Sequence, residues 1–202
     1  MSNLGKVIGF EGIDRSGKSS AVVYVQKKLE EIGYSVISVN SKFVAGNRVP
    51  AMVGCYPDEV VYMFWWQAIR MTDLTVILPA LEEGKTVLSD RGVLSNLAYS
   101  WDSLDYDFRK RIGDIYFKRC ELPDLTLIFE VSFEKFKERD DGSPAFTAEK
   151  FGAISQNYRY WGDKLAQTGK EVVFIDGTRK VNVVHEEVFQ IIKVFLEEDL
   201  SG

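Results

Sequence analysis

The segment with the clearest capacity for chemistry is GIDRSGKS, residues 12–19. It satisfies the pattern G-x-x-x-x-G-K-[ST], in which glycines let several backbone N–H groups point at one bound anion. Lys18 can then reach the β- and γ-phosphates of a nucleoside triphosphate, while the hydroxyl of Ser19 can ligate Mg²⁺. The pattern therefore predicts a phosphate-binding loop, formed by Gly12, Ile13, Asp14, Arg15, Ser16, Gly17, Lys18, Ser19 and Ser20.

The elements on either side of this loop are the ones that the motif requires. Residues 6–10 (KVIGF) form an apolar run typical of a buried strand, and residues 18–32 show the periodicity of an amphipathic helix that ends at Gly33. A helix that begins at the loop directs the positive end of its dipole at the bound phosphates. A glycine turn that matched the motif by chance would lack these flanks, so we interpret the loop as functional.

The rest of the chain alternates short β-branched runs with helical patterns. Further strands are predicted at residues 35–39, 86–89, 125–131 and 171–176, and helices at roughly 58–83, 93–119, 133–140, 147–168 and 181–198. This alternation predicts an α/β fold in which a parallel five-stranded sheet is flanked by helices on both faces. Because no repeat or Pro/Gly-rich linker interrupts residues 1–202, one domain is expected, with its clearest internal loop at residues 138–146 (ERDDGSPAF).

The composition argues against several classes of function. A net charge of −5 and a pI near 5.1 disfavour a protein that grips a nucleic acid polymer, although placed Arg and Lys residues can still hold one nucleotide. No apolar run is long enough to span a membrane, and the N-terminus is too polar for a signal peptide. A cytoplasmic protein with no membrane partner is therefore expected.

Cysteine and histidine usage narrows the chemistry further. Cys55 and Cys120 match no metal-ligand or redox spacing and are expected to be reduced thiols. The single histidine, His185, is expected at the surface of the last helix. One histidine excludes the usual Ser–His triads and His-bridged metal sites.

A phosphate-binding loop alone does not separate kinases from GTPases, motor-type ATPases or non-catalytic nucleotide sensors. The sequence contains no N-K-x-D motif for reading guanine, which a small GTPase would ordinarily show. It also lacks the length and the additional modules of a large mechanical ATPase. A small kinase is the favoured class.

Five segments along the chain, kept in order and spacing, resemble the thymidylate kinase family. In the first, an acidic residue precedes the first glycine of the loop and an Asp lies within it. Each later segment is a weak signal alone, but the five together are specific and span nearly the whole chain. They are FEGIDRSGKSS (10–20), FWWQAIR with PALEEGKTVLSDR (64–70 and 79–91), SDRGVLSNLAYS (89–100), PDLTLIFEV (123–131) and IDGTRKVNVVHEEV (175–188).

The resemblance implies a single-domain P-loop kinase fold that transfers the γ-phosphoryl group of ATP to dTMP, giving dTDP and ADP. It also implies Mg²⁺ as the cofactor, a short lid near residues 138–147 and a homodimer. The catalytic residues it implies are Arg15, Lys18, Asp90 and Arg91, with Ser19 and Asp90 at the metal ion. The acceptor nucleotide would be bound by Asp14, Phe43, Trp66, Arg70, Arg91, Ser95, Asn96 and Tyr99.

Two residue pairs in this set have a chemical rationale of their own. Asp90 and Arg91 end a predicted strand, and open α/β sheets collect their ligands at that edge. The resemblance implies that Asp90 helps to hold Mg²⁺, directly or through water, and that Arg91 binds the acceptor phosphate; a plain surface ion pair is the alternative. Trp66 and Arg70 lie at i and i+4, hence on one helix face. The resemblance places them on the acceptor base, whereas Trp65 or Trp66 could equally be a core aromatic.

Four further residues are assigned to the sugar and the base by resemblance alone. Ser95, Asn96 and Tyr99 fall where the family lines the base and sugar of the acceptor. Asp14 resembles the loop Asp that accepts a hydrogen bond from the 3′-hydroxyl group. For Tyr99 a position in the core is an equal alternative.

Arg15 is the most diagnostic single residue of the loop. Phosphoryl transfer needs positive charge on the migrating group, and an Arg from the same chain is a common source of it. In one subtype of the family this Arg lies in the P-loop and the lid is poor in basic residues. In the other subtype the P-loop position is a small residue and the lid carries the arginines. Here Arg15 accompanies a lid stretch, DDGSPAF, that contains no Arg or Lys. The alternative is a solvated loop arginine.

Several positions depart from the family pattern. The segment NSKFVAGNR (40–48) stands where the family has R-E-P-G or R-F-P-x-R, and keeps only Lys42, Phe43 and Arg48. Gly92 takes the third place of the D-R-[YH] triplet, and Glu130 replaces a strand Asp, where it could also act as a Walker B carboxylate. These departures leave the identity of the acceptor undetermined by the sequence. The alternatives are a kinase for another nucleotide or deoxynucleoside, and a non-catalytic nucleotide-binding regulator.

Overall fold

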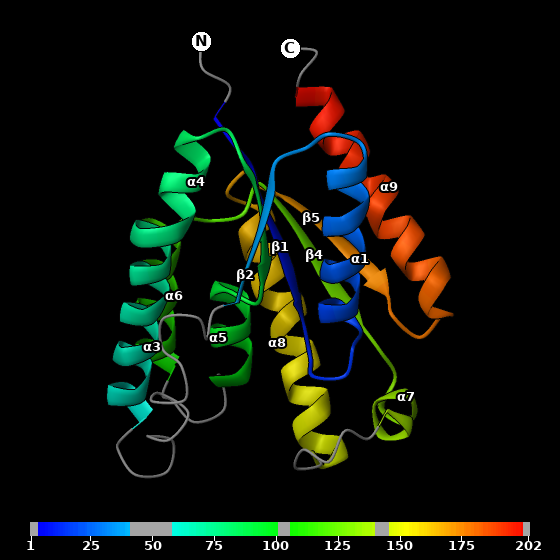
Figure 1. Cartoon of the computed structure of the whole chain (residues 1–202). Coiled ribbons are helices and arrows are strands. Elements are labelled where there is room, and N and C mark those ends of the chain that lie inside the picture. The colour runs from blue at the N-terminus through cyan, green and yellow to red at the C-terminus, as the bar shows by residue number, and fades with distance from the viewer. Residues whose placement is uncertain (1–3, 41–57, 101–105, 140–145, 200–202) are drawn as a thin grey trace.

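The computed structural model describes residues 4–40, 58–100, 106–139 and 146–199. Five parallel strands in these residues form a sheet with the order β2-β3-β1-β4-β5 (Figure 1). This confirms the predicted sheet, and each strand lies close to its predicted range. The strands are β1 (Val7–Gly12), β2 (Val36–Asn40), β3 (Thr86–Asp90), β4 (Leu125–Glu130) and β5 (Glu171–Asp176).

The central strands are apolar because helices cover both of their faces. Every residue of β1 is buried, and so are all residues of β3 and β4 except the last of each. Strands buried on both sides read as continuous hydrophobic runs instead of alternating patterns. The edge strands β2 and β5 are more exposed.

Helices form a layer on each side of the sheet, as predicted (Figure 1). On one face α1 (Lys18–Glu31) and α9 (Val181–Asp199) pack against each other over Phe10, Leu88 and Phe129. The other face carries α5 (Val93–Ser100) and α8 (Ala148–Ala166), whose buried side chains share one core cluster with those of α3 (Asp58–Thr72) and α6 (Tyr106–Arg119). Two short helices, α4 (Leu78–Glu82) and α7 (Phe133–Glu138), complete the described elements.

Two predicted helices are each divided in the structure. The helix expected at residues 58–83 consists of α3, a π-helical segment η2 (Asp73–Ile77) and α4. Pro79 has no N–H group and its ring clashes with the carbonyl four residues earlier, so the turn before it widens. The helix expected at residues 93–119 is described as α5 and α6, and residues 101–105 between them lie outside the described residues.

The carboxyl ends of the strands bring the predicted site residues to one edge of the sheet. The chain passes from β1 to β2 on one side and from β3 across β1 to β4 on the other, so the strand order reverses beside β1. A crevice at such a switch point is where open α/β sheets bind ligands. The phosphate loop after β1 and the Asp90–Arg91 turn after β3 face each other there.

None of the described helices combines the length and the apolar character needed to cross a bilayer.

Candidate active site

The phosphate loop has the backbone conformation that anion binding requires. Gly12 and Gly17 have φ values of 137° and 99°, a region where side chains are strained. A Cβ atom at Gly12 would lie 2.5 Å from the carbonyl oxygen of Phe129, so a side chain has no room. Helix α1 begins directly after Gly17, and no side chain caps its first N–H groups. The loop and the helix end therefore present backbone donors to an anion.

Lys18 is held inside the loop. Its Nζ donates to the carbonyl oxygen of Ile13 at 3.1 Å, and the residue is only 4% exposed. Burial lowers the pKa of Lys18 to about 8, although the carboxylates of Asp14, Asp90 and Glu11 act in the opposite direction. A phosphate bound beside Lys18 would therefore stabilise the charged form of this buried ammonium group.

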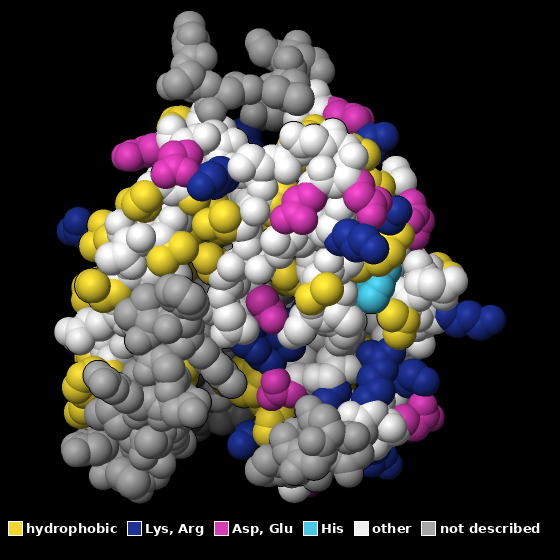
Figure 2. Space-filling view, viewed as in Figure 1, with side chains coloured by type: hydrophobic (Ala, Val, Ile, Leu, Met, Phe, Trp, Pro, Cys, Tyr) yellow, Lys and Arg dark blue, Asp and Glu magenta, His cyan; other side chains and the backbone are white. Residues whose placement is uncertain are grey.

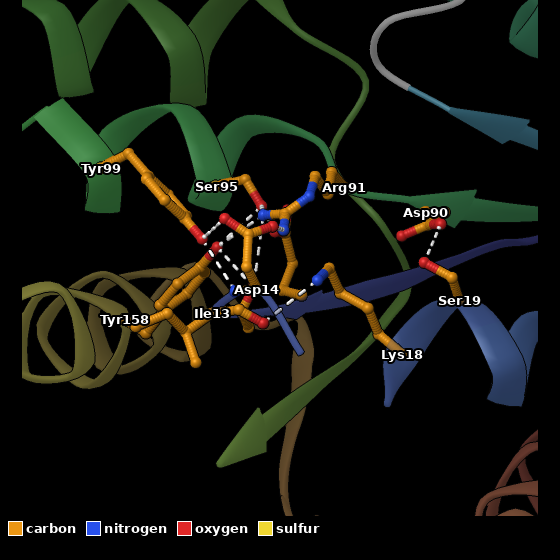
Figure 3. A network of polar contacts seen from close by, with 11 residues as sticks. Ile13, Asp14, Lys18, Ser19, Asp90, Arg91, Ser95, Tyr99 and Tyr158 are labelled. Atoms are coloured by element: carbon orange, nitrogen blue, oxygen red, sulfur yellow. Dashed lines mark hydrogen bonds and ion pairs between the residues drawn. The ribbon is translucent and has the colours of Figure 1, made fainter. Parts of the chain in front are cut away.

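Ser19 at the start of α1 and Asp90 at the end of β3 are in contact, and their oxygens fit a magnesium ion. Ser19 Oγ donates to Asp90 Oδ2 at 2.7 Å (Figure 3). The other oxygen, Asp90 Oδ1, is buried and has no hydrogen-bond partner among the described residues. Oxygen ligands suit Mg²⁺, which is commonly held by one or two side chains together with phosphates and water. Among the described residues, no group of three or more His, Cys, Asp or Glu side chains could hold a metal ion.

Arg91 lies at the centre of a polar network that joins the strand ends (Figure 3). Its Nη2 forms an ion pair with Asp14, and its Nη1 donates to Gly12 O at 3.3 Å, Ser95 Oγ at 3.2 Å and Tyr158 Oη at 3.4 Å. The guanidinium group is largely buried, with 13% of the side chain exposed. A buried Arg that is already neutralised by one carboxylate remains a strong site for a phosphate, because its fork offers several donors.

Tyr99 links α5 to the phosphate loop. Its hydroxyl donates to Asp14 Oδ2 at 2.7 Å and accepts from the backbone N–H of Asp14 at 2.8 Å. The ring lies edge-on to Tyr158 and below the guanidinium of Arg91, whose Cζ is 5.3 Å from the ring centroid. Tyr99 thus packs against the core and also contacts the phosphate loop. A core position and a position in the site, which the sequence left as alternatives, are both correct.

Trp66 and Arg70 lie apart from this network. Among the described residues, neither forms a hydrogen bond with the network around Arg91. Arg70 Nη1 pairs with the buried Asp73 Oδ2 at 3.1 Å, and Trp66 packs against the core cluster on its side of the sheet. Both line a cavity of about 570 Å³ together with Asp114, Ile115, Lys118 and Arg119 of α6. Phe43, Lys42 and Arg48 lie outside the described residues, so the acceptor-base residues stay a prediction.

Arg139 is a site residue that the sequence interpretation missed. The stretch DDGSPAF contains no basic residue, but Arg139 immediately precedes it and reaches back to the loop. Its Nη1 donates to Arg15 O at 3.0 Å and its Nη2 to Gly177 O at 2.8 Å. The guanidinium of Arg15 itself lies over the ring of Phe136 in α7, 4.8 Å from the centroid. The lid base is therefore not free of positive charge.

A second cavity, of about 290 Å³, lies on the other side of the loop. Half-buried His185 borders it, with Nε2 3.1 Å from Ser20 Oγ and the ring 5.1 Å from that of Tyr24. Sequence patterns placed His185 only on the last helix, because periodicity cannot show which neighbour a helix face meets. Figure 2 shows a group of Lys and Arg side chains below the histidine. The cavity is lined by Arg15, Ser16, Gly17, Ser20, Arg139, Gly177, Arg179, Val181, Val184 and His185.

Glu130 does not have the surroundings of a Walker B carboxylate. Both of its carboxyl oxygens are paired with Arg159 of α8, through Nε at 2.7 Å and Nη2 at 2.8 Å. This bidentate pair directs the carboxylate of Glu130 at α8, so its strongest partner is a cation of the same chain. The metal ligands predicted at Ser19 and Asp90 lie at the start of α1 and the end of β3.

The fold and these features define a P-loop protein with a buried arginine, Arg91, held against the loop. A sequence model of thymidylate kinase matches residues 10–188. A thymidylate kinase of Mycoplasma capricolum is 28% identical over 95% of this chain and 96% of its own length. A thymidylate kinase of Legionella pneumophila is 28% identical over 99% and 100%, and a probable thymidylate kinase of Methanosarcina barkeri is 30% identical over 96% and 99%. The chain belongs to the thymidylate kinase family.

Proposed function

We propose that the protein transfers the γ-phosphoryl group of ATP to dTMP, giving dTDP and ADP. The observation that carries this proposal is the guanidinium of Arg91, which comes from the turn after β3 and is held against Asp14 and Gly12 of the P-loop. A protein that only bound or hydrolysed ATP would not need a second buried phosphate-binding cation there. The family consists of ATP-dependent phosphotransferases, and the alternatives of a regulator or another kinase are not favoured.

In this proposal, ATP and the acceptor occupy different regions of the site. The triphosphate of ATP would lie along the N–H groups at the start of α1, with its nucleoside in the 290 Å³ cavity beside His185 and Arg139. The acceptor phosphate would lie against Arg91, close to Asp14 and Tyr99. This arrangement places the γ-phosphate and the acceptor phosphate at the same edge of the sheet for an in-line displacement.

Catalysis in this arrangement comes from positioning and charge neutralisation. Lys18 and Arg15 would neutralise the β- and γ-phosphate oxygens, and Arg91 would hold the attacking phosphate, which needs no strong general base. Ser19 and Asp90 would hold Mg²⁺, which supplies further positive charge to the phosphates when bound. Asp14 would orient the sugar of the acceptor through its carboxylate.

A lid over residues 138–147 would exclude water during transfer. Residues 140–145 lie outside the described residues, but both flanks of this segment contact the site. Arg139 binds the loop carbonyl of Arg15, and Phe146 packs on Phe136 and edge-on to Tyr99, with centroid distances of 5.6 Å and 6.1 Å. A segment anchored on both sides of the phosphates can shield them from hydrolysis.

The role of Arg139 at the lid base leads to a kinetic prediction. Arg139→Ala should raise the KM for ATP about tenfold, because two hydrogen bonds from one charged group to the carbonyls of Arg15 and Gly177 are lost. Arg139→Lys should be almost as impaired, because an ammonium group cannot span both carbonyls. Steady-state kinetics measure both, with the exposed Arg111→Ala on α6 as the control. A KM for ATP within twofold of wild type in Arg139→Ala would contradict the assignment.

The acceptor is tested with a panel of nucleotides. The purified protein with Mg·ATP would be mixed separately with dTMP, dUMP, UMP, CMP, AMP and GMP, and ADP formation followed. We expect strong turnover with dTMP. Turnover with a different monophosphate would leave the transfer mechanism standing. It would attribute the different acceptor specificity to residues 40–48. ATP binding without turnover on any of them would overturn the proposal in favour of a deoxynucleoside kinase or a regulator.

Trp66 and Arg70 remain the residues we propose for the base of the acceptor. Their support is the shared face of α3 and the proximity of Asp73 to the turn at Arg91, since Asp73 and Arg91 line the same small cavity. We propose that Ser95 and Asn96 of α5, together with Phe43, line the rest of the acceptor site. Binding of dTMP would have to release Arg70 from Asp73 or use its remaining donors.

A homodimer is proposed from an exposed apolar stripe. Val60, Met63, Phe64 and Met71 of α3 recur at helical spacing, and each is between 37% and 47% exposed. Leu74 of η2 continues this spacing and is 51% exposed, and Figure 2 shows hydrophobic side chains on the flank of the molecule that carries α3. Apolar patches of this kind mark protein interfaces.

The double variant Phe64→Glu/Met71→Glu should convert a wild-type dimer into a monomer in sedimentation equilibrium. A wild-type protein that is monomeric at high micromolar concentration would refute the dimer.

Finally, we propose that residues 1–202 act as one domain in the cytoplasm, where ATP and nucleoside monophosphates occur.

A further inference from the structure

Glu11 of β1 is a buried carboxyl group for which the proposed reaction has no use. Only 3% of the residue is exposed. One of its oxygens, Oε2, is in hydrogen-bond contact with Ser95 Oγ, and the carboxyl group also accepts from the backbone N–H of Gly92. Glu11 therefore touches both the turn that carries Arg91 and the hydroxyl group to which Arg91 donates.

The turn at Arg91 depends on such contacts. Arg91 has a φ of 71°, a left-handed conformation that a residue with a side chain keeps only when its surroundings enforce it. Its N–H donates to Phe10 O at 3.0 Å, and its carbonyl oxygen accepts from Ser89 Oγ at 3.0 Å. The bond from Gly92 N–H to Glu11 fixes the next peptide unit. Glu11 is thus one of the groups that set the direction of the Arg91 side chain.

A chain of three oxygen–oxygen contacts runs from Glu11 to the phosphate loop. Glu11 Oε2 contacts Ser95 Oγ, Ser95 Oγ lies 2.8 Å from Tyr158 Oη, and Tyr158 Oη lies 2.9 Å from Gly12 O. Each contact needs one proton between its two oxygens. The hydroxyl groups of Ser95 and Tyr158 supply one proton each, and a backbone carbonyl supplies none.

The third proton has to come from Glu11. The N–H groups of Arg91 point at Ser95 Oγ, Tyr158 Oη and Gly12 O as separate bonds, so they do not fill a gap between two oxygens. With a proton on Glu11, the chain can run from its carboxyl O–H to Ser95, from Ser95 to Tyr158 and from Tyr158 to Gly12 O. With an ionised Glu11, one of the three contacts would join two lone pairs.

We propose that Glu11 is a neutral carboxylic acid in the assembled site and that its proton positions Arg91 for the acceptor phosphate. It does so through Ser95 and Tyr158, which accept from the guanidinium group. Burial supports this, because it raises the pKa of Glu11 to about 7 although Ser95, Arg91 and Lys18 favour the ionised form. A neutral acid also spares the arriving phosphate a nearby negative charge.

A pH dependence follows from this arrangement. The groups facing Glu11 are Arg91 from the β3–α5 turn, Lys18 from α1 and Tyr158 from α8, while Asp73 and Glu121 line the same 30 Å³ cavity. Raising the pH through about 7 removes the proton from Glu11 and breaks the chain. The position of Arg91 then loosens, and the KM for the acceptor should rise while the KM for ATP changes little.

The protonation of Glu11 is measurable without substrate, so it does not depend on the proposed function. Infrared difference spectra between the wild type and Glu11→Gln at pH 6 should contain a C=O band of a protonated carboxyl group, absent from the variant. This band should disappear from the wild type as the pH is raised to 8.5. No such band at pH 6 would overturn the inference even if the enzyme is fully active.

The kinetic consequence, which rests on the proposed function, is tested with two variants. Glu11→Gln keeps a donor and an acceptor without titrating, so its acceptor KM should stay within about twofold of the wild-type value at pH 6.5 and remain flat to pH 8.5. The wild-type KM should rise about fivefold over this range, and Glu11→Ala should raise it about tenfold at every pH. The matched control is Glu82→Gln, on the exposed end of α4.

Three kinetic results would overturn the positioning role. Glu11→Gln as impaired as Glu11→Ala would mean that an ionised carboxylate is needed. A pH dependence of the acceptor KM that persists in Glu11→Gln would assign it to another group. An equal rise in the KM values for ATP and acceptor would point to a general effect on the loop. If the wild type turned over no acceptor at all, the proposed function would fail, and the infrared experiment would still decide the state of Glu11.

Discussion

Replacing Arg15 by Ala should lower kcat for phosphoryl transfer by about three orders of magnitude, while ATP binding weakens less than tenfold. An Arg supplied to the migrating phosphoryl group is worth 10³–10⁵ in comparable enzymes, because it stabilises charge that develops only in the transition state. The ground-state triphosphate is held chiefly by the backbone N–H groups of the loop and by Lys18. Single-turnover kinetics and equilibrium ATP binding measure the two effects separately.

The control for this prediction uses the backbone of Arg15. Its φ of 61° lies in the left-handed region, where Ala is strained and Gly is not. Arg15→Gly should therefore be as inactive as Arg15→Ala if the guanidinium is what matters. Activity regained in Arg15→Gly would show that loop geometry caused the loss. A fall in kcat of less than tenfold in both variants would assign the charge to another cation, of which Arg139 is the nearest candidate.

Replacing Lys18 by Met should abolish transfer and at the same time stabilise the substrate-free protein. The loss should exceed about 10³-fold in kcat/KM, because the ammonium group that contacts the β- and γ-phosphates is gone. Burial lowers the pKa of Lys18 from 10.5 to about 8, so folding disfavours its charged form. Met keeps the volume of the stem without the charge, and we expect a gain of about 1–2 kcal/mol at pH 7.

The pH dependence of this gain provides its check. Because the folded-state pKa of Lys18 lies below the unfolded value, the cost of its charge is fully present below pH 8 and disappears as the pH rises to 10.5. The stability advantage of Lys18→Met in denaturant titrations should therefore be constant up to about pH 8 and shrink above it. A variant less stable than wild type at pH 7 would show that the bond to Ile13 O outweighs the desolvation.

The parts of the site that sequence patterns predicted are those carried by contiguous residues or by strand ends. The loop of residues 12–20 is a local motif, and the rule that parallel strands end at one edge brings Asp90 and Arg91 opposite it. Ser95 and Tyr99 follow on α5 at i+4 and i+8 from Arg91, and both join its network. These two residues were singled out by the family resemblance alone, because the helical pattern does not show which face of α5 meets the loop.

The residues that were missed come from helices late in the chain. Tyr158 of α8, Arg139 at the end of α7 and His185 of α9 each contact the loop from more than 120 positions away. A helical pattern shows which face of α8 is buried, but the partner of that face depends on how the helix crosses the sheet. The division of the predicted helix at residues 58–83 was missed for a different reason, since Pro79 was not recognised as a cause of a widened turn.

The most direct measurement of the central claim follows the phosphoryl group itself. The protein would be incubated with Mg²⁺, dTMP and ATP labelled with ³²P at the γ-position, and the products separated by chromatography. The proposed function predicts label in dTDP, formed in equal amount to ADP, with little label in inorganic phosphate. Label that appears only in inorganic phosphate, at the same rate with and without dTMP, would contradict it.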